Sequence, residues 1–403
     1  SGGVLDADNS LTVSGTLTHT GNITLDVAET KTLTYTGDAI SLGANTMTLS
    51  GGGSLNNTNA LVLSEPDSKL LLNSISLDSV STTSDSLGLD VDADSTVTSL
   101  TVANITPVAI VSGSSLSGGI TLTAGSLNLS EAGTLASTIS MSGGVLDADN
   151  SLTVSGTLTH TDDITIDVAE TKTLTYSGAA ISVGANTLTL SGGGSLVSGG
   201  LTLNDPSSML LLNSITVDSV STTSYSLGLD VDADSTVTSL LVAHITPVSI
   251  ANTKSLSGAI TLTAGSIKLN ETGTLASTIS MSGGVLDADE SSTVSGTLTQ
   301  SGAITLDVAE TKTLTYTGTA ISLGANTLTL SGGGTLSNTN ALVLNDENSL
   351  LSLAGILTIG DVEGTAAANA GKGIQVTSSA TLGDYDLSAG SYLSIAANQT
   401  LAG

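Results

Sequence analysis

Apolar and polar residues alternate along most of the chain. In ITLDV at residues 23–27 three aliphatic side chains alternate with a threonine and an aspartate, and in KTLTYT at residues 31–36 Leu33 and Tyr35 alternate with threonines. A period of two places successive side chains on opposite faces of an extended strand. Helical spacing is not convincing anywhere, so the pattern predicts an all-β protein.

The sequence also repeats itself over a long period. The octapeptide SGGVLDAD begins at Ser1 and returns at Ser142 and Ser282. The repeat predicts an array over residues 1–354 made of three copies: residues 1–141, 142–281 and 282–354. A catalytic site is normally built once from unlike residues, so literal repetition indicates a chain that extends a structure.

Equivalent apolar positions of the three copies exchange only aliphatic residues. The sets are Leu25, Ile166 and Leu306; Leu42, Val183 and Leu323; and Met47, Leu188 and Leu328. The turn HTGN at residues 19–22, in contrast, becomes HTDD at 160–163 and QSGA at 300–303. We therefore expect the aliphatic positions to face a core and the turns to face solvent.

Short strands of about five to seven residues that return after roughly 17 to 21 residues favour a β-solenoid. We expect an all-β parallel β-helix of about 20 coils, wound right-handed and on the order of 95 Å long at ~4.8 Å per coil. A single coil is too thin to bury its own aliphatic side chains, so the stack supplies the core, and each buried Leu or Ile contributes about 1.5 to 3 kcal/mol. A stack of antiparallel sandwich domains is the alternative, disfavoured by the short return distance and the missing aromatic core.

Residues 355–403 depart from the repeat. The small residues of EGTAAANAGKG at 363–373 predict a loop that leaves the stack, followed by two or three closing coils. Neither end shows the polar or helical cap that solenoids usually need. We therefore expect the array to continue, either in further sequence or in another subunit.

The composition excludes several classes of function. The 403 residues include 36 Asp plus Glu, seven Lys and no Arg, for a formal charge of −29, and they lack Cys, Trp and Phe. Nucleic acids and anionic membrane surfaces are bound through clustered cations, so neither is expected as a partner. The absence of Cys excludes disulfides and thiol chemistry. Regular alternation argues against disorder.

Targeting signals are not visible in the sequence. No run approaches the ~18 apolar residues of a membrane-spanning helix, so we expect no membrane insertion. The first residues lack the basic and apolar regions of a signal peptide. Because Ser1 opens on the same octapeptide as the later copies, we expect the chain to be processed or excised from a longer one, with any export signal outside it.

The strongest candidate for a binding site is the run LDVDADS, at residues 89–95 and again at 229–235. On a continuous strand its aspartates would share one outward face, about 6.7 Å apart. They are Asp90, Asp92, Asp94, Asp230, Asp232 and Asp234. Rows of carboxylate oxygens suit a structural or weak Ca²⁺ site. The run lacks the glycine and distal glutamate of an EF-hand, which favours a solvated acidic face over a metal site.

Two further surfaces are suggested by outward-facing residues. Threonine rows, such as Thr46 with Thr48, resemble the flat faces of some ice-binding proteins, although Thr is also simply a good strand former. In the run KLLLN and its equivalents, alternation points one apolar set outward as a partner surface: Leu71, Met209, Leu211 and Leu350. Exposed apolar pairs of this kind predict lateral or end-to-end contacts between subunits.

Catalytic chemistry is not indicated. The histidines are His19, His160 and His244, and the first two occupy one turn position that Gln300 fills in the third copy. Serines are abundant, but without a nucleophile elbow or a histidine at a distinctive spacing. We expect no enzymatic activity.

The runs VLDADNSLTVSGTLT, LTYTG and LTLSGGGSL resemble the β-helical repeat regions of bacterial surface proteins, the autotransporter passengers and filamentous-haemagglutinin-type adhesins. The resemblance covers nearly the whole chain and lies in its style of repetition, so no functional residue is carried over. It implies an exported structural or adhesive part at the cell surface. We therefore expect an extracellular fibre or sheath subunit, or the stalk of an adhesin, that self-associates head to tail or laterally.

Overall fold

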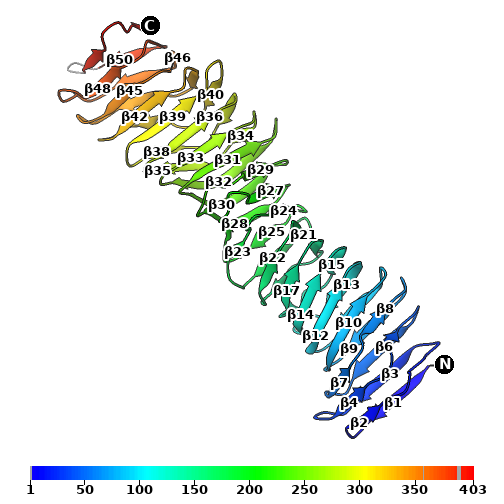
Figure 1. Cartoon of the computed structure of the whole chain (residues 1–403). Helices are drawn as coiled ribbons and strands as arrows, with labels where there is room; N and C mark the ends of the chain where they lie inside the picture. The colour runs from blue at the N-terminus through cyan, green and yellow to red at the C-terminus, as the bar shows by residue number, and fades with distance from the viewer. Residues whose placement is uncertain (1, 357, 388–391) are drawn as a thin grey trace. The chain divides into compact units, whose positions relative to one another are not determined.

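The chain folds as a parallel β-solenoid of about 20 coils, as the alternation and the repeats predict (Figure 1). The computed structural model describes residues 2–356, 358–387 and 392–403. Within these residues there are strands and no helix. The chain divides into two compact units, here called unit 1 (residues 1–181 and 186–200) and unit 2 (residues 182–185 and 201–403).

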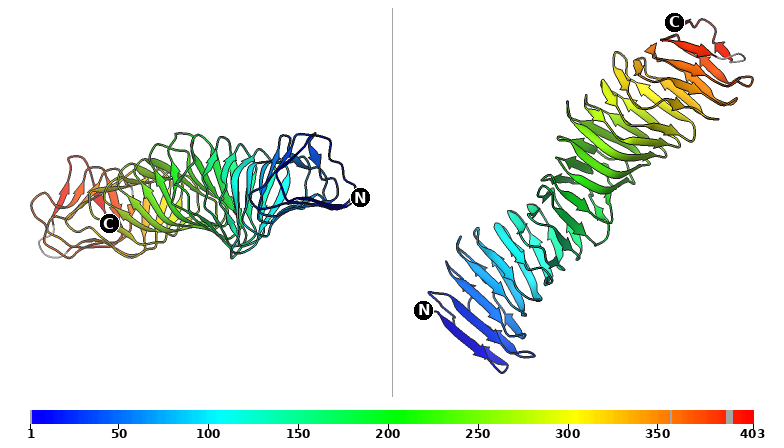
Figure 2. Two further views of the ribbon diagram at one scale, coloured as in Figure 1. Left: turned by 90° about the horizontal axis from the view of Figure 1, so that it is seen from below. Right: turned by 180° about the vertical axis from the view of Figure 1, so that it is seen from behind.

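Each coil passes through three faces of the solenoid, and equivalent strands of successive coils lie side by side in each face (Figure 2). In unit 1 the first face consists of β1 (Gly3–Ala7), β3 (Ile23–Val27), β6 (Thr46–Ser50), β9 (Lys69–Leu72), β11 (Gly88–Val91), β13 (Ile105–Ile110), β15 (Ser126–Leu129), β18 (Val145–Ala148), β21 (Ile164–Val168) and β24 (Thr187–Ser191). Its second face consists of β2 (Leu11–Val13), β4 (Thr32–Tyr35), β7 (Ser54–Asn57), β10 (Ser76–Thr82), β12 (Ser95–Val102), β14 (Ser115–Leu122), β16 (Thr134–Leu135), β19 (Leu152–Val154), β22 (Thr173–Tyr176) and β25 (Ser195–Val197). Its third face contains β5 (Ile40–Ser41), β8 (Leu61–Leu63), the ends of β10, β12 and β14, β17 (Thr138–Met141) and β20 (Leu158–His160), and the chain leaves the unit at β23 (Ile181–Ser182).

Unit 2 has the same three faces. The first consists of β27 (Met209–Leu212), β29 (Gly228–Val231), β31 (Ile245–Ile250), β33 (Ser266–Leu269), β36 (Val285–Ala288), β39 (Ile304–Val308), β42 (Thr327–Ser331), β45 (Leu350–Leu353), β48 (Gly373–Val376) and β51 (Leu393–Ile395). The second consists of β28 (Thr216–Thr222), β30 (Ser235–Val242), β32 (Ser255–Leu262), β34 (Thr274–Leu275), β37 (Ser292–Val294), β40 (Thr313–Tyr316), β43 (Thr335–Asn338), β46 (Thr358–Ile359), β49 (Ala380–Leu382) and β52 (Leu401–Ala402). The third contains β26 (Leu201–Leu203), the ends of β28, β30 and β32, β35 (Thr278–Met281), β38 (Leu298–Gln300), β41 (Ile321–Ser322), β44 (Leu342–Leu344), β47 (Val362–Gly364) and β50 (Tyr385–Leu387).

The core is a set of aliphatic columns that run from coil to coil. In β3 and β6, for example, Leu25 lies opposite Leu49, and both side chains point inward and are no more than 2% exposed. The positions that exchange only aliphatic residues between copies are all buried, as predicted: Leu25, Ile166, Leu306, Leu42, Val183, Leu323, Met47, Leu188 and Leu328. Each coil therefore completes its core only with the help of its neighbours.

Three buried tyrosines join neighbouring coils. The hydroxyl oxygens of Tyr35 and Tyr176 accept the backbone N–H groups of Leu17 and Leu158 at 2.9 and 3.0 Å. The Tyr316 hydroxyl accepts the N–H of Leu298 at 3.1 Å. These hydrogen bonds satisfy backbone donors where the chain turns between the second and third faces.

The structure also corrects the expected lengths. Leu70 pairs with Leu89, 19 residues later, but Leu25 pairs with Leu49, 24 residues later, so the coils reach beyond the expected upper limit. Strands span two residues in β5 and eight in β14, a wider range than expected. The longer coils contain Gly-rich corners such as residues 51–53, which lengthen a coil without adding strand.

The C-terminal loop is shorter than predicted. Glu363 and Gly364 belong to β47 and pair with Val343 and Leu344, so the loop begins after Gly364. Strands β48 to β52 follow it and continue the three faces.

Candidate functional site

The predicted aspartate rows do not lie along single strands. β11 ends at Val91, so Asp90 lies on the first face, whereas Asp92 and Asp94 lie in the corner before β12. In the second copy β29 ends at Val231, with Asp232 and Asp234 in the equivalent corner. The expectation of three carboxylates on one strand face was therefore wrong, because the chain turns in the middle of the run.

Individual aspartates of these runs bind neighbouring coils. Oδ1 of Asp94 accepts the backbone N–H of Ser115 at 2.8 Å and its hydroxyl at 3.0 Å. Asp234 receives the same two hydrogen bonds from Ser255, at 2.8 and 3.0 Å. Such contacts cap a corner by joining it to the next coil, which is a structural role.

Calcium binding at these runs stays a prediction. No group of three or more His, Cys, Asp or Glu side chains within the described part of the chain is arranged to hold a metal ion. Asp94 and Asp234 already accept hydrogen bonds, and Asp92 and Asp232 lie exposed in the corners. The donor set is therefore dispersed, and it does not fit the six to eight oxygen ligands that Ca²⁺ takes.

The two copies of the run differ in their counter-charge. Nζ of Lys69 lies 2.5 Å from a carboxylate oxygen of Asp90. In the second copy Met209 stands where Lys69 stands in the first, beside Gly228 of the next coil. Burial raises the pKa of Asp230, and Asp232 and Glu271 raise it further. Asp90 in the first copy therefore has a lysine counter-charge, whereas the equivalent Asp230 in the second copy has Met209 in place of that lysine.

A more concentrated acidic feature is the aspartate column, an outward row on the first face of unit 1 formed by Asn128, Asp147 and Asp167. Parallel pairing in register places these side chains directly above one another, about 4.8 Å apart. Burial raises the pKa of Asp147 to about 6, with further contributions from Asp149 and Asp167. Burial and the neighbouring carboxylates therefore disfavour the charged form of Asp147.

The equivalent column in unit 2 contains a cation. Lys268 replaces Asn128, and its Nζ lies 3.3 Å from Asp287 and 2.9 Å from Asp289. These contacts, led by the hydrogen bond to Asp289, raise the pKa of Lys268. Burial still raises the pKa of Asp287, although Lys268 opposes that effect. The two copies thus offer a matched comparison of the same column with and without a lysine.

We expect Lys268→Asn to lower the free energy of unfolding by about 1 kcal/mol, because it leaves Asp287 and Asp289 without their cation at a partly exposed site. The reciprocal change Asn128→Lys should stabilise unit 1 by a smaller amount, since Asn128 also accepts a hydrogen bond from Ser126. Urea denaturation followed by circular dichroism measures both. Destabilisation by both changes would show that the lysine does not act through the aspartates.

The aspartate column also predicts a pH dependence. The carboxyl of Asp147 titrates near 3.8 when unperturbed and near 6 in the fold, so its charged form is disfavoured by folding. This group contributes most to stability at low pH, and the contribution is lost as the pH rises from about 4 through 6. Asp147→Asn should therefore raise the melting temperature at pH 7.5 by a few degrees, and by much less at pH 4. A gap between variant and wild type that stays constant with pH would contradict this.

Hydroxyl residues form a second column in unit 1, on its third face. Ser81, Thr101, Thr121, Ser140 and Thr159 lie opposite one another in successive coils. The neighbouring residues line a shallow hollow on the surface, including Thr98, Thr138 and Thr157. In unit 2 the equivalent column is interrupted by Leu241, which is 43% exposed.

The side chains of the predicted partner surface are half-buried and lie in rows. Leu71, Met209, Leu211 and Leu350 all point outward as expected, but each is partly covered by neighbouring coils. More exposed apolar residues occur elsewhere: Leu87 and Ile105 in unit 1, and Tyr225, Leu227 and Ile245 in unit 2. The ring of Tyr225 meets that of His244 edge to face, with centroids 5.8 Å apart. Whether any of these surfaces binds a partner stays a prediction.

His19 lies outside the strands, whereas His160 is the last residue of β20. Nδ1 of His19 lies 3.0 Å from the carbonyl oxygen of Gly21, and Nδ1 of His160 lies 3.0 Å from that of Asp162. In both copies the ring thus contacts the turn that follows the histidine. This contact is a structural use of the residue.

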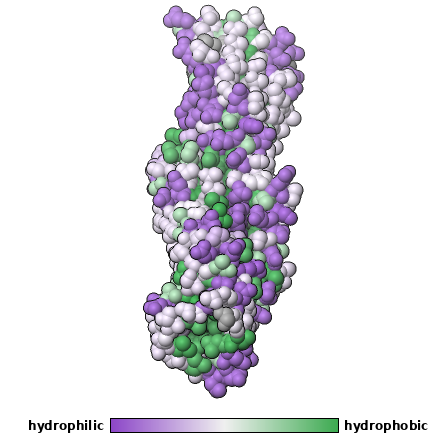
Figure 3. Space-filling view, turned by 90° about the vertical axis from the view of Figure 1, so that its right-hand side faces the viewer, coloured by the Kyte–Doolittle hydropathy of each residue, from purple (hydrophilic) through white to green (hydrophobic). Residues whose placement is uncertain are grey.

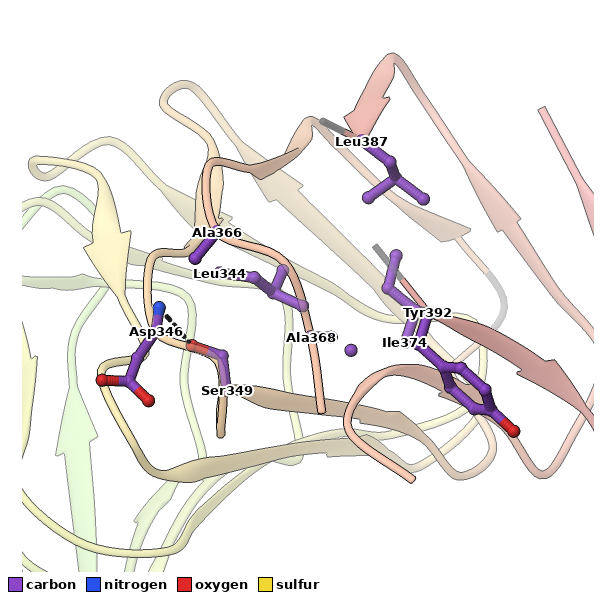
Figure 4. Close-up of a pocket in the computed structure, with 9 residues that line it drawn as sticks. Leu344, Asp346, Ser349, Ala366, Ala368, Ile374, Leu387 and Tyr392 are labelled. Carbon is purple, nitrogen blue, oxygen red and sulfur yellow. Dashed lines mark hydrogen bonds between the residues drawn. The ribbon is translucent and has the colours of Figure 1, made fainter. Parts of the chain in front are cut away.

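A small cavity lies under the C-terminal loop in unit 2 (Figure 4). Leu344, Ile374 and Leu387 point into it, Ala366 and Ala368 cover it, and Tyr392 lies at one side. The Ser349 hydroxyl accepts the backbone N–H of Asp346 at 3.0 Å nearby. The cavity volume of about 10 Å³ has room for one water molecule at most.

Comparison with known proteins does not indicate a function, so the function has to be inferred from the geometry of the chain itself. No family model, curated protein or solved structure matches the chain. Among the described residues there is also no helix with the length and hydropathy needed to span a membrane. The distinctive polar groups of the chain contact neighbouring coils, and this arrangement is suited to holding a stack together.

Proposed function

We propose that the chain is an extracellular structural protein, a subunit of a fibre or sheath. One observation carries this proposal: the polar contacts that distinguish the chain recur in its copies and join one coil to the next. Asp94 and Asp234 bind the following coil with the same geometry, and Tyr35, Tyr176 and Tyr316 all accept an N–H group from the preceding coil. Residues of a catalytic site would differ from copy to copy.

The extracellular location is supported by the resemblance to bacterial surface repeats and by the surface charge. An acidic chain with a formal charge of −29 stays soluble and repels unwanted association with other acidic surfaces. A solenoid also reaches its size by adding coils, without needing a larger core. These properties suit a component outside the cell, where reach matters more than a binding pocket.

Immunogold labelling of intact cells of the source organism, with antibodies raised against the purified chain, tests this function. We expect gold on fibres or a sheath at the outer surface, with little label in sections of the cytoplasm. Label confined to the cytoplasm would overturn the proposal. Label on the surface without any repeating assembly would favour the second form of the function, the stalk of a large adhesin.

Ice binding is the second candidate, and the hydroxyl column of unit 1 favours it. Five stacked hydroxyl residues from Ser81 to Thr159 present a regular row to water. Thermal hysteresis of the purified chain, compared with a Thr121→Lys variant, tests this function. Ice crystals that grow without shaping or hysteresis in the wild type would dispose of it. A calcium-binding surface module has less support, because its donors are dispersed.

A further inference from the structure

A hollow lined by seven hydroxyl side chains lies at the corner where the second face of unit 1 turns into the third. Its volume of about 320 Å³ falls within the ~300 to 1,000 Å³ that is usual for small-molecule sites. Four successive coils contribute to it, through β12, β14, β17 and residues 157–159. No charged side chain is among its lining residues.

The hydroxyl groups of the hollow form two parallel rows that run across these coils. The inner row lies on the third face and consists of Thr121, Ser140 and Thr159. The corner row lies two residues earlier in each coil and consists of Thr98 with Ser99, Gly119, Thr138 and Thr157. All seven hydroxyl residues are exposed.

The hollow exists because Gly119 interrupts the corner row. Every other member of that row has a hydroxyl side chain, whereas Gly119 has no side chain. The pairing of β12 with β14 shifts register between Val97 and Leu100, so that Thr98 and Ser99 together face the single Gly119. A bulge of this kind redirects side chains at a corner. The gap at Gly119 is therefore bordered by hydroxyl groups of the coils on both sides.

Most of the lining hydroxyl groups have no partner within the protein. Those of Thr138 and Thr159 donate to the backbone carbonyl groups of Gly118 and Ile139, at 3.3 and 3.4 Å. The other five form no hydrogen bond with any group in the part of the chain that the structure describes. Because a hydroxyl can donate one hydrogen bond and accept two, the hollow offers both donors and acceptors to a ligand.

Exposed hydroxyl groups alone would not mark a site, because they are common on this molecule. Much of the surface in Figure 3 is pale, which is the colour of residues near the middle of the hydropathy scale, such as Ser, Thr and Gly. The hollow differs from this background because a gap in one row recesses the surface between two sets of hydroxyl groups.

The chemistry of the lining favours a neutral ligand that is rich in hydroxyl groups. A metal ion such as Ca²⁺ takes carboxylate ligands, and the lining has none. An anionic group would meet no cation there, and exposed Asp78 lies one coil away, opposite Thr98. A saccharide both donates and accepts hydrogen bonds, as the hollow does. Ice would match an unbroken flat row better than a row that Gly119 interrupts.

We propose that the hollow binds a neutral saccharide, with part of the ligand seated in the gap at Gly119. Thr98 and Thr138 hydrogen-bond the ligand from the corner row, and Thr121 with Ser140 hydrogen-bond it from the inner row. Because the coils repeat every ~4.8 Å, the rows contact successive groups along a saccharide chain. This inference goes beyond the proposed structural function and does not depend on it.

The equivalent place in unit 2 provides a matched comparison. Ala259 stands where Gly119 stands in unit 1, and it lies opposite Thr278 in the same register. Leu241 replaces Thr101, which extends the inner row by one coil. The fold thus accepts a methyl group in the gap. We therefore assign the saccharide site to unit 1 and not to its equivalent in unit 2.

Affinity electrophoresis in native gels tests the site, because the formal charge of −29 carries the chain toward the anode. The probes are dissolved dextran, mannan and galactan, which are neutral polysaccharides, with polygalacturonate as an anionic comparison. We expect at least one neutral polysaccharide to retard the wild type and polygalacturonate to leave its mobility unchanged. The proposal is overturned if none of the three neutral polymers retards the chain, or if polygalacturonate retards it more strongly.

Two substitutions test whether binding takes place in the hollow. Gly119→Ala adds a Cβ that would lie 3.1 Å from the carbonyl oxygen of Thr98 and 3.8 Å from Oγ1 of Thr138, as the methyl group of Ala259 does in kind. Thr121→Val removes one hydroxyl and keeps the shape of the side chain. We expect the dissociation constant to rise roughly threefold to tenfold in each variant, as the loss of one or two hydrogen bonds predicts.

The control is Thr165→Val, which removes an outward hydroxyl on the first face of the same unit. It should be retarded like the wild type. Circular dichroism and the melting temperature establish that each variant is folded. Equal retardation of the control, both hollow variants and the wild type would place the binding elsewhere and overturn the proposal.

The reverse exchange in unit 2 should create a second site. Ala259→Gly combined with Leu241→Thr restores the gap and the missing hydroxyl, and the other lining positions carry the same residues as in unit 1. The polysaccharide that retards the wild type should retard this variant more strongly. Mobility equal to that of the wild type would contradict the assignment of the site to the gap. Because this result does not involve the cell-surface label, failure of the saccharide site and failure of the fibre function are separate observations.

Discussion

Replacing Ile166 with Asn should lower the free energy of unfolding by about 4 kcal/mol or more. Ile166 lies in β21, between Leu146 and Leu190 of the coils on either side, and is 1% exposed. Truncating a buried Ile costs about 2 to 5 kcal/mol, and burying an amide without partners adds about 1 to 3 kcal/mol. Because each coil contacts only its neighbours, the damage should spread along the stack of unit 1.

The matched control is Thr165→Asn, at the adjacent residue of the same strand. Thr165 points outward between Val145 and Thr189, so the new amide can reach water. We expect a loss below about 1 kcal/mol there. Urea denaturation followed by circular dichroism measures both variants. Similar losses for Thr165→Asn and Ile166→Asn would contradict the assignment of inward and outward positions.

Gly88→Ala should be among the most damaging glycine substitutions in unit 1, with a loss of about 2 to 5 kcal/mol. Gly88 has φ +78°, a left-handed conformation that costs an L-residue about 1 to 2 kcal/mol. A Cβ there would also lie 1.8 Å from the carbonyl oxygen of Pro107 in the next coil. Relieving such overpacking costs about 1 to 3 kcal/mol more.

Gly113→Ala separates these two effects. Gly113 has φ +91°, but a Cβ there meets no atom within 4 Å. We expect the conformational part of the loss alone, about 1 to 2 kcal/mol. Thermal and urea unfolding of the two variants give the difference. If Gly113→Ala is as damaging as Gly88→Ala, close approach between coils is not what requires glycine at Gly88.

Alternation and repetition were sufficient to predict the fold. A period of two reports which side of a strand faces the core, and the copies show which positions tolerate only aliphatic residues. Leu25, Ile166 and Leu306 illustrate this, since all three are buried in equivalent columns. The coil length was less predictable, because a corner such as residues 51–53 adds residues without changing the alternation on either side.

The candidate site was harder to predict because alternation continued across a corner. Val91 and Ser95 both point inward, on either side of the turn that contains Asp92 and Asp94, so the run looked like one strand. Alternation alone is also misleading at Leu87. It is in phase with Leu89 and Val91, yet it is 51% exposed because Gly88 turns the backbone between them.

Differences between the copies nevertheless indicate features that alternation alone did not reveal. Comparing the copies shows Lys268 in place of Asn128, and Met209 in place of Lys69, which are the changes in counter-charge that the structure places beside aspartates.

The stacking of coils in register is tested most directly by distances measured along one column. Thr46, Lys69, Gly88, Pro107, Asn128, Asp147, Asp167 and Ser191 occupy successive coils of the first face of unit 1. The chain has no cysteine, so spin labels can be attached at introduced cysteines alone. Pulsed electron paramagnetic resonance then measures the distance from Thr46→Cys to Asn128→Cys, Asp167→Cys or Ser191→Cys.

At ~4.8 Å per coil the backbone separations should be about 19, 29 and 34 Å, growing with the number of coils crossed. The label distances should follow this order, with one narrow distribution for each pair. Distances that fail to grow from coil to coil, or that split into values expected for separate antiparallel domains, would contradict the solenoid and every proposal built on it.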